Sequence, residues 1–298
     1  MASPTQEQPI YVLGRTNAER DRLRRQGRLV SKMTRHFLEE AGLRAGMRVL
    51  DVGSGVGDVA LLAARMVAPG GQVIGIDVDE SALQLARHRA ATEEVRNVQF
   101  HACDFQEYAN DGLFDVVVGR CVLLHQHNPG VALASVAKHA RSSGIVAFQE
   151  PWFSRGFSFP KMPLFDDVLG WLHRTIQASG LDGDIGLRLA GIFAAVGLPT
   201  PKLTFEMLVD CSADSEIWQF VADTVRSLLP RLEQLGIVNA AGAQLDTLAD
   251  RLRQEQFNLG SVVGVMPLMG AWCRKPQIDA IPAEKTKPPI AKKLRMSP

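Results

Sequence analysis

The segment RVLDVGSGVGD, residues 48–58, predicts a short buried strand, a tight loop and the first turn of a helix. In the loop, glycine stands at every second position, as Gly53, Gly55 and Gly57, with Ser54 between the first two. Glycine lets the backbone turn sharply and lets a ligand lie against it without meeting a Cβ atom. The helix that follows begins with unpaired N–H groups. We therefore expect one wall of a ligand-binding crevice here.

Two details of this loop distinguish between nucleotide ligands. The dinucleotide fingerprint has the spacing GxGxxG, whereas this loop has GxGxG, and Asp58 stands where that fingerprint needs its last glycine. Asp51 precedes the first glycine of the loop. A carboxylate there would repel a pyrophosphate but can hold, directly or through water, the ammonium group of an amino acid. Both details favour S-adenosylmethionine (SAM), which carries a methionine moiety and no phosphate, over NAD.

Two more aspartates follow strand-like segments. Asp77 ends VIGID (73–77) and can accept hydrogen bonds from both hydroxyls of a ribose. Asp104 follows segment 98–103 and can accept from the exocyclic amine of adenine, while an adjacent apolar side chain packs on the ring. Taken alone, each aspartate is more often a turn or cap residue. Because the three carboxylates follow successive strands, we predict that they share one site.

Strand-like and helical segments alternate through the first half of the chain. We expect strands at 48–52, 73–77, 98–103, 114–119 and 144–149, and helices at 16–41, 59–67, 81–91 and 130–141. This pattern predicts βαβ units and a parallel sheet, which binds ligands beyond the carboxyl ends of its strands. Later segments predict helices at 163–179, 185–196, 215–229 and 242–256, and strands at 202–209 and 261–272. The predicted fold class is α/β, Rossmann-like, with a mostly parallel seven-stranded sheet, helices on both faces and a helical cap.

Four stretches of the chain are similar to the cofactor motifs of one family. They are MRVLDVGSGVGDVALLAA, VIGIDVDESAL, NVQFHACDF and FDVVVGRCVLLHQHNPGVAL. The chain resembles the class I SAM-dependent methyltransferases, particularly the small-molecule branch of ubiquinone/menaquinone-biosynthesis type. The resemblance covers roughly residues 11–152, with a looser match onward to residue 276. It implies the class I methyltransferase fold and SAM as cofactor.

The resemblance also implies which residues contact the cofactor. They are Asp51, Gly53, Gly55, Asp77, Val78, Asp104, Phe105 and the backbone around Arg120 and Cys121. Members of the family often close the pocket with an N-terminal helix, so Tyr11, Arg15 and Gln26 become candidate contacts to the amino-acid tail of SAM. Ser54 and Gly57 complete the predicted cofactor-binding loop.

Two residues are candidates for catalysis. His125 lies just past the fourth strand, and its ordinary pKa suits a general base near neutral pH; the alternative is a polar residue that caps a helix or lines the pocket. Glu150 ends the fifth strand and could hold an amine substrate or assist a base, or equally form a structural salt bridge. The fourth strand leads into Gly119-Arg120-Cys121-Val122, which lacks the acidic ligands of a magnesium site, so we expect no metal.

Two groups of side chains have competing interpretations. The helix predicted at 16–41 carries a basic face, which we interpret as solvated, with the acidic partners Glu19 and Asp21 close by, rather than as an anion-binding surface; it consists of Arg20, Arg22, Arg24, Arg25, Arg28 and Lys32. An aromatic group after the fifth strand predicts either core packing or an apolar pocket for a planar or hydrophobic metabolite. This group comprises Trp152, Phe153, Phe157, Phe159, Phe165, Trp171 and His173.

Composition limits the remaining possibilities. The net charge of +1 gives no global field to recruit nucleic acid or an anionic membrane, and no apolar run reaches the roughly 18–20 residues of a membrane span. Residues 1–9 lack the apolar core of a secretory signal. The four cysteines lie far apart without a CxxC pair, which argues against zinc and fits a reducing cytoplasm. The sequence leaves the oligomeric state open.

These observations predict an N-terminal tail at 1–15, a SAM-binding domain at 16–275 and a disordered basic tail at 276–298. Helical cap insertions are expected near 155–182 and 211–257. We expect metal-independent methyl transfer from SAM to an O, N or C atom of a small, apolar or aromatic metabolite. The alternatives are a SAM-fold protein that catalyses another reaction or acts as a binding module, an NAD-dependent oxidoreductase and, more distantly, a nucleic-acid methyltransferase.

Overall fold

The computed structural model describes residues 16–109 and 112–277. The predicted N-terminal tail, with Tyr11 and Arg15, lies outside the described residues, as does the predicted C-terminal tail from residue 278 onward.

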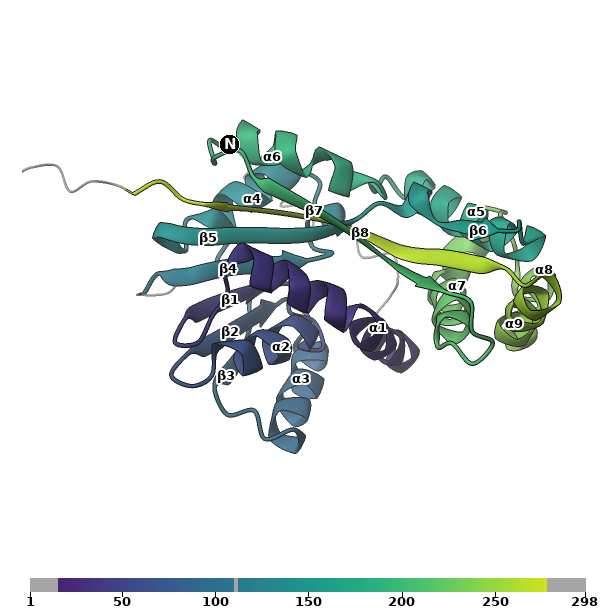
Figure 1. Cartoon of the computed structure of the whole chain (residues 1–298), viewed down its shortest axis with the longest axis horizontal. Helices are drawn as coiled ribbons and strands as arrows, with labels where there is room; N and C mark the ends of the chain where they lie inside the picture. Colours follow the sequence, from purple (N-terminus) through teal and green to yellow (C-terminus); the bar gives the residue numbers. More distant parts are fainter. Residues whose placement is uncertain (1–15, 110–111, 278–298) are drawn as a thin grey trace, which may run out of the picture.

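The described residues form one eight-stranded sheet (Figure 1). Five strands pair in parallel in the order β3-β2-β1-β4-β5. They are β1 (Arg48–Val52), β2 (Gln72–Asp77), β3 (Val98–Ala102), β4 (Phe114–Arg120) and β5 (Ala140–Pro151). The long β8 (Val262–Arg274) runs antiparallel to β5, and both β6 (Phe157–Phe159) and β7 (Lys202–Asp210) pair with it. The predicted Rossmann-like, mostly parallel sheet is confirmed, and the short β6 is the additional eighth strand.

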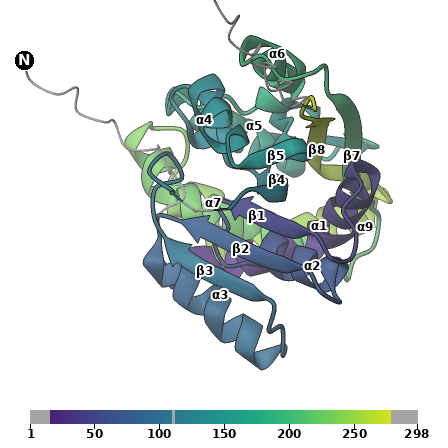
Figure 2. The same ribbon diagram turned by 90° about the vertical axis from the view of Figure 1, so that its left-hand side faces the viewer.

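Helices cover both faces of the sheet (Figure 2). On one face α1 (Asn17–Ala41), α2 (Asp58–Val67) and α3 (Glu80–Thr92) pack against alternate strand residues such as Val49, whose neighbour Leu50 points to the other face. There α4 (Pro129–Ala137) and α6 (Leu189–Ala195) complete a second core. Val49 and Leu50 are both fully buried, as expected for parallel strands covered on two sides.

Some boundaries differ from the sequence expectations. The helix expected at 130–141 ends at Ala137, because Ala140 already pairs with Phe114 at the start of β5. The helix expected at 215–229 is α7 (Ile217–Gln234), which continues through Pro230. The segments expected at 185–196 and 242–256 are each divided between shorter helices, listed in order as η3 (Ile185–Arg188), α6, α8 (Ala240–Ala243), η4 (Leu245–Thr247) and α9 (Leu248–Leu259). Local periodicity does not report such breaks, because they depend on strand pairing and tertiary packing.

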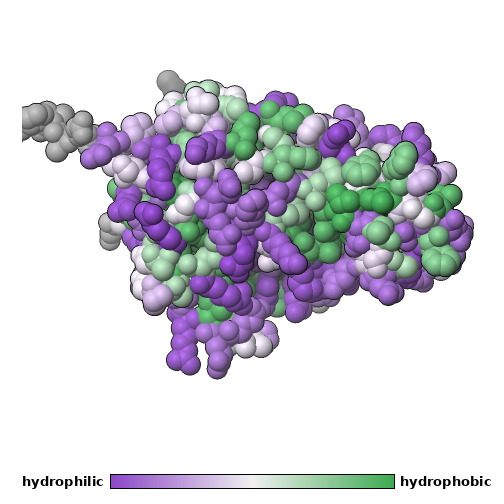
Figure 3. All heavy atoms as spheres, in the orientation of Figure 1, coloured by the Kyte–Doolittle hydropathy of each residue, from purple (hydrophilic) through white to green (hydrophobic). Residues whose placement is uncertain are grey.

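A third core lies at the N-terminal end of β8. It is built by α5 (Pro163–Ala178), α7, α8 and α9, which we call the cap helices, around the fully buried Trp218 and Phe165. The rings of these two residues meet edge to face, with centroids 6.5 Å apart. In Figure 1 the cap helices stand to one side of the parallel strands. On the face shown in Figure 3, apolar side chains gather toward this end of the molecule.

The basic face of α1 is solvated only in part, since Arg24, Arg28 and Lys32 are exposed. Arg22 is buried and makes a two-pronged ion pair with the buried Glu19, with both N···O distances 2.7 Å. Arg25 lies 3.2 Å from Asp223 and 3.6 Å from Glu216, on and just before α7. The solvated interpretation was wrong for Arg22, which is buried with its neighbour Glu19, and for Arg25, whose acidic partners lie about two hundred residues away along the chain.

Within the described ranges, none of the helices combines the length and the apolar character needed to cross a bilayer.

Candidate functional site

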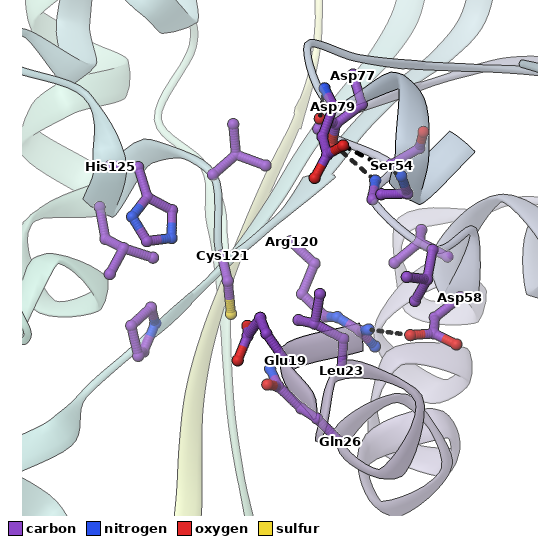
Figure 4. A pocket seen from close by; sticks show the side chains of 18 of the residues that line it. Glu19, Leu23, Gln26, Ser54, Asp58, Asp77, Asp79, Arg120, Cys121 and His125 are labelled. Carbon is purple, nitrogen blue, oxygen red and sulfur yellow. Dashed lines mark hydrogen bonds and ion pairs between the residues drawn. The ribbon is translucent and has the colours of Figure 1, made fainter. Parts of the chain in front are cut away.

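A cavity of about 250 Å³ lies beyond the carboxyl ends of the parallel strands. Its walls come from the glycine loop after β1, the ends of β2 and β3, the turn after β4, helix α1, the cap helices α5 and α7, and β8. Figure 4 shows Asp77 and Asp79 on one side of this space and His125 on the opposite side.

The glycine loop has the backbone that its composition requires. Gly53, Gly55 and Gly57 have φ angles of +64°, +50° and +85°, a region that favours glycine. A Cβ atom at Gly53 would lie 2.7 Å from a methyl of Val122, and one at Gly57 would lie 2.9 Å from Cβ of Ala86. Around Gly55 the same space is empty, so a ligand can approach the backbone there. Gly53, Ser54 and Gly55 line the cavity, whereas Gly57 packs against α3.

Asp51 is fully buried beneath the loop and does not line the cavity. Neither carboxylate oxygen makes a hydrogen bond of ordinary geometry within the described residues. Burial raises the pKa of Asp51 to about 8, although the charge of Arg120 and the amide of Ala60 act in the opposite direction. A buried carboxylate without a partner is costly, and a cation placed next to it lowers that cost. The position therefore fits a ligand that brings an ammonium group to the loop.

Asp77 joins the second strand to the glycine loop. Its Oδ2 accepts a hydrogen bond from the Gly55 N–H and its Oδ1 accepts one from the Asp79 N–H, both at 2.8 Å. The carboxylate also lines the cavity. Val78, with 46% of its surface exposed, lines the same wall. Asp79, which the sequence reasoning did not select, also lines it while capping α3.

The end of β3 supplies the next part of the wall. Asp104 lines the cavity and its Oδ1 accepts a hydrogen bond from the Gln106 N–H at 2.8 Å, which fixes the turn. Phe105 is buried in the core below while still reaching the cavity. Cys103 lies beside them, and burial together with neighbouring acidic groups raises the pKa of its thiol. A carboxylate next to an apolar ring can hold a heteroaromatic base.

Arg120 and Gln26 reach the cavity from β4 and α1. Arg120 donates to Thr34 Oγ1 at 3.0 Å and lies 3.9 Å from Asp58. Gln26 accepts from Arg22 at 2.7 Å. Side chains from two distant segments thus form a polar floor of the cavity next to the glycine loop.

Sequence reasoning missed part of this floor. Glu19 and Arg22 both line the cavity, on the same face of α1 as Gln26. Their spacing of three and then four residues is the signal that could have found them, because such residues share one face of a helix.

The two catalytic candidates have different positions. His125 lines the cavity at the end of η1 (Leu123–His125). Glu150 is fully buried and does not line it. The Glu150 carboxylate instead accepts from the backbone N–H groups of Val122, Leu123 and Leu124, at 2.9, 2.8 and 3.3 Å. Burial raises its pKa to about 7, with these three amides acting in the opposite direction.

The wall opposite the glycine loop is largely aliphatic. It consists of Pro151, Phe153, Leu172, Ile176, Phe220, Thr224, Leu228, Met266, Pro267 and Leu268. Of the predicted aromatic group, Phe153 is the member that lines the cavity, while Phe165 is buried in the core of the cap helices and Phe159 is 75% exposed. Of the two interpretations of this group, core packing therefore describes Phe165, and the group does not form an aromatic wall of the cavity. The predicted apolar character of the pocket remains.

Within the residues that the structure covers, no group of three or more His, Cys, Asp or Glu side chains is arranged to hold a metal ion.

Comparison with known proteins shows that part of the chain is similar to methyltransferases. Residues 43–179 match the family model described as a methyltransferase domain. A ubiquinone biosynthesis O-methyltransferase of Acinetobacter baylyi is 38% identical over 112 residues, which is 37% of this chain and 46% of that protein. A ubiquinone/menaquinone biosynthesis C-methyltransferase of Pseudomonas putida is 33% identical over 141 residues, which is 44% of this chain and 55% of that protein. The chain thus spans about half the length of the curated relatives it matches.

A solved structure shows the same fold over most of the chain. It belongs to a protein of Bacillus halodurans C-125 described as a methyltransferase. The TM-score is 0.54 at 18% identity, and the match covers 82% of this chain and 99% of that one. The matched segment, 43–179, includes the glycine loop, Asp77, Asp104 and His125. Residues 43–179 are therefore similar to a methyltransferase domain, and the fold of the chain is shared with that solved structure.

Proposed function

We propose that this protein transfers the methyl group of SAM to an O, N or C atom of a small, apolar or aromatic metabolite. One observation carries the proposal: a single cavity joins the glycine loop, Asp77 and Asp104 to the aliphatic wall of the cap helices, and His125 lies on the side opposite Asp77. Class I sheets bind ligands at this edge, and an apolar wall suits an apolar acceptor.

The polar end of the cavity fits the parts of SAM. Gly53, Gly55 and Ser54 would lie against its methionine moiety, whose ammonium would be held by Asp51 through water, since that carboxylate lies behind the loop. Asp77 would accept from the ribose hydroxyls, and Asp104 from adenine. Val78 and Phe105 would contact the adenine base, and Gln26 and Arg120 would lie near the amino-acid tail. When bound, SAM supplies a methyl group activated by its sulfonium.

The other end of the cavity would align the acceptor. Leu172, Ile176 and Phe220 present an apolar surface that excludes water and fixes an apolar molecule in place. Alignment alone accounts for up to about 7–11 kcal/mol of barrier lowering in favourable cases. His125 would act as general base where the acceptor must lose a proton, and would otherwise line the pocket.

The same arrangement supports the domain organisation inferred from the sequence. We propose that residues 16–275 form one catalytic domain, and that the insertions near 155–182 and 211–257 serve as its cap. The α5 and α7 helices, which lie in these insertions, supply much of the aliphatic wall. The two named relatives are an O- and a C-methyltransferase of quinone biosynthesis, which supports a small-molecule acceptor and leaves the acceptor atom open. The four cysteines are free thiols, which supports a cytoplasmic location.

The proposal is tested by incubating the full chain with methyl-labelled SAM and a panel of phenols, quinols, amines and activated carbon acids. Transfer of label to an apolar or aromatic member of the panel is the expected result. Thermal-shift measurements should show stabilisation by SAM and none by NAD. Binding of SAM without a labelled product anywhere in the panel would contradict methyl transfer. Stabilisation by NAD alone would contradict the cofactor assignment.

A further inference from the structure

The turn that follows β4 has a rare backbone conformation. Cys121, its first residue, has a φ of +56°, which a residue with a side chain adopts only where its surroundings hold it. The Cys121 N–H donates to the carbonyl of Gln149 at 2.9 Å, in continuation of the β4–β5 pairing. We call residues 121–125 the β4 turn; it ends at His125.

A single buried side chain holds this turn. Oε1 of Glu150 accepts from the N–H groups of Val122 and Leu123, and Oε2 accepts from that of Leu124. Glu150 belongs to β5 and pairs with Met269 of β8, so its backbone is held by the neighbouring strand. Three consecutive amides of a strained turn therefore take their geometry from one carboxylate in the centre of the sheet.

The β4 turn touches both ends of the cavity. Its Val122 side chain packs so closely on Gly53 that a Cβ atom there would lie 2.7 Å from a Val122 methyl. From the same turn, Cys121, Leu124 and His125 line the cavity. The position of the turn therefore sets the separation between the glycine loop and the side chains that would face an acceptor.

We propose that Glu150 is a positioning residue, which holds the β4 turn through three backbone amides and so keeps the acceptor side of the cavity aligned with the glycine loop. This inference rests on the proposed methyl transfer. Glu150 itself lies outside the cavity lining, so direct contact with a substrate is not its role. Reactions that depend on alignment are sensitive to shifts of about 1 Å, which a loosened turn would allow.

The surroundings of Glu150 also predict a pH dependence. The charged and titratable side chains near Glu150 are Arg120 of β4, Cys121 and His125 of the β4 turn, and Arg22 of α1 on the side of Cys121. The neighbours that β8 and η3 contribute, Met269 and Gly186, are uncharged. A charged Glu150 accepts from all three amides, whereas protonation turns one of its oxygens into an O–H donor and a weaker acceptor, which faces amide donors. Since burial raises the pKa of Glu150 to about 7, the turn should loosen as the pH falls below that value.

The variant E150Q tests this role with little change in shape. Its amide oxygen can still accept from Val122 and Leu123, but its NH₂ group faces the Leu124 N–H, and two donors cannot pair. E255Q is the matched control. Glu255 of α9 likewise accepts from two backbone amides, those of Leu164 and Phe165 at the start of α5, and does not line the cavity.

We would record ¹H–¹⁵N spectra of the full chain between pH 6 and 8. The amides of residues 122–124 should titrate together in the wild type, and in E150Q they should shift and lose this titration, with a smaller shift at Gly53. E255Q should leave these signals unchanged. With an acceptor identified by the assay with methyl-labelled SAM, E150Q should lower kcat roughly 10- to 100-fold and change the SAM Kd less than about threefold. E255Q should affect neither.

The fall of kcat at low pH distinguishes a positioning role of Glu150 from an effect on stability alone. With an acceptor that loses no proton, so that no general base is needed, this fall at low pH should be present in the wild type and in H125N and absent in E150Q. Unchanged amide signals in E150Q, or a kcat no lower than that of E255Q, would overturn the role of Glu150. If the wild type binds SAM but methylates nothing, the proposed function fails, while the amide spectra still decide whether Glu150 holds the turn.

Discussion

Asp77 and Gly55 are joined by a 2.8 Å hydrogen bond from the Gly55 N–H to the Asp77 carboxylate. The carboxylate at the tip of the second strand thus fixes the backbone of the glycine loop at the tip of the first. Because Gly55 is also the position where a ligand can approach the loop most closely, one side chain both shapes the crevice and faces its contents.

This double role predicts that D77A weakens SAM binding strongly. Hydrogen bonds to charged groups are worth about 1.5–3 kcal/mol each, so loss of one ribose contact should raise the Kd roughly 10- to 150-fold. D77N keeps one acceptor oxygen and should lose less, and H125A should change the Kd less than about threefold. Calorimetric titration of the three variants gives the order. A larger effect of H125A than of D77A would show that the cofactor end has been misplaced.

SAM affinity should rise with pH between pH 6 and 7.5. Burial raises the pKa of Asp51 to about 8, so the free protein carries a proton on this carboxylate throughout that range. An ammonium group brought beside it favours the charged form, so binding releases the proton and affinity increases by up to about tenfold per pH unit. Above this range the α-amino group of the ligand itself begins to lose its proton, at about 7.7–8.0.

Calorimetry in two buffers of different ionisation enthalpy measures the released proton directly. D51N cannot release one, and its affinity should be lower and nearly independent of pH over this range. A wild-type affinity that falls from pH 6 to 7.5 would contradict an ammonium group next to Asp51.

G27A should destabilise the fold even though alanine is the better helix former. A Cβ atom at Gly27, in the middle of α1, would overlap the carboxylate of Asp58, which pairs with Arg89 at 2.8 Å. Overpacking typically costs about 1–3 kcal/mol, which outweighs the roughly 1 kcal/mol gained in helix propensity. Gly170 of α5 has nothing within 4 Å of the same atom, so G170A should stabilise by about 0.5–1 kcal/mol. Urea unfolding of both variants measures the difference, and equal effects would contradict the tight α1–α2 contact.

H125A should lower kcat by about 10²–10⁴-fold if the acceptor is a hydroxyl or an amine that must lose a proton. His127 provides the control, since it is exposed and lies outside the lining of the main cavity, and H127A should leave turnover within about twofold by the same reasoning. Steady-state rates with labelled SAM give the comparison. Equal rates for the two variants would mean that His125 only lines the pocket and that alignment supplies the acceleration.

The sequence alone predicted the cofactor end of the cavity. The alternating glycines 53, 55 and 57, and the aspartates at 77 and 104, each lie at the end of a strand, and a parallel sheet brings such ends to one edge. Ligand preference followed from spacing, because GxGxG after Asp51 does not suit a pyrophosphate. These features are local, so a few covalently linked residues specify them.

Only the tertiary structure decided the rest. The buried Glu19–Arg22 pair, the aliphatic wall from α5 and α7 and the amide contacts of Glu150 join segments that are far apart in the chain. Periodicity reports that a helix has an apolar face, but not which distant surface covers it, and a carboxylate at a strand end looks the same whether it faces a ligand or a neighbouring turn. That choice depends on non-local packing, which places Asp77 at the cavity and Glu150 behind it.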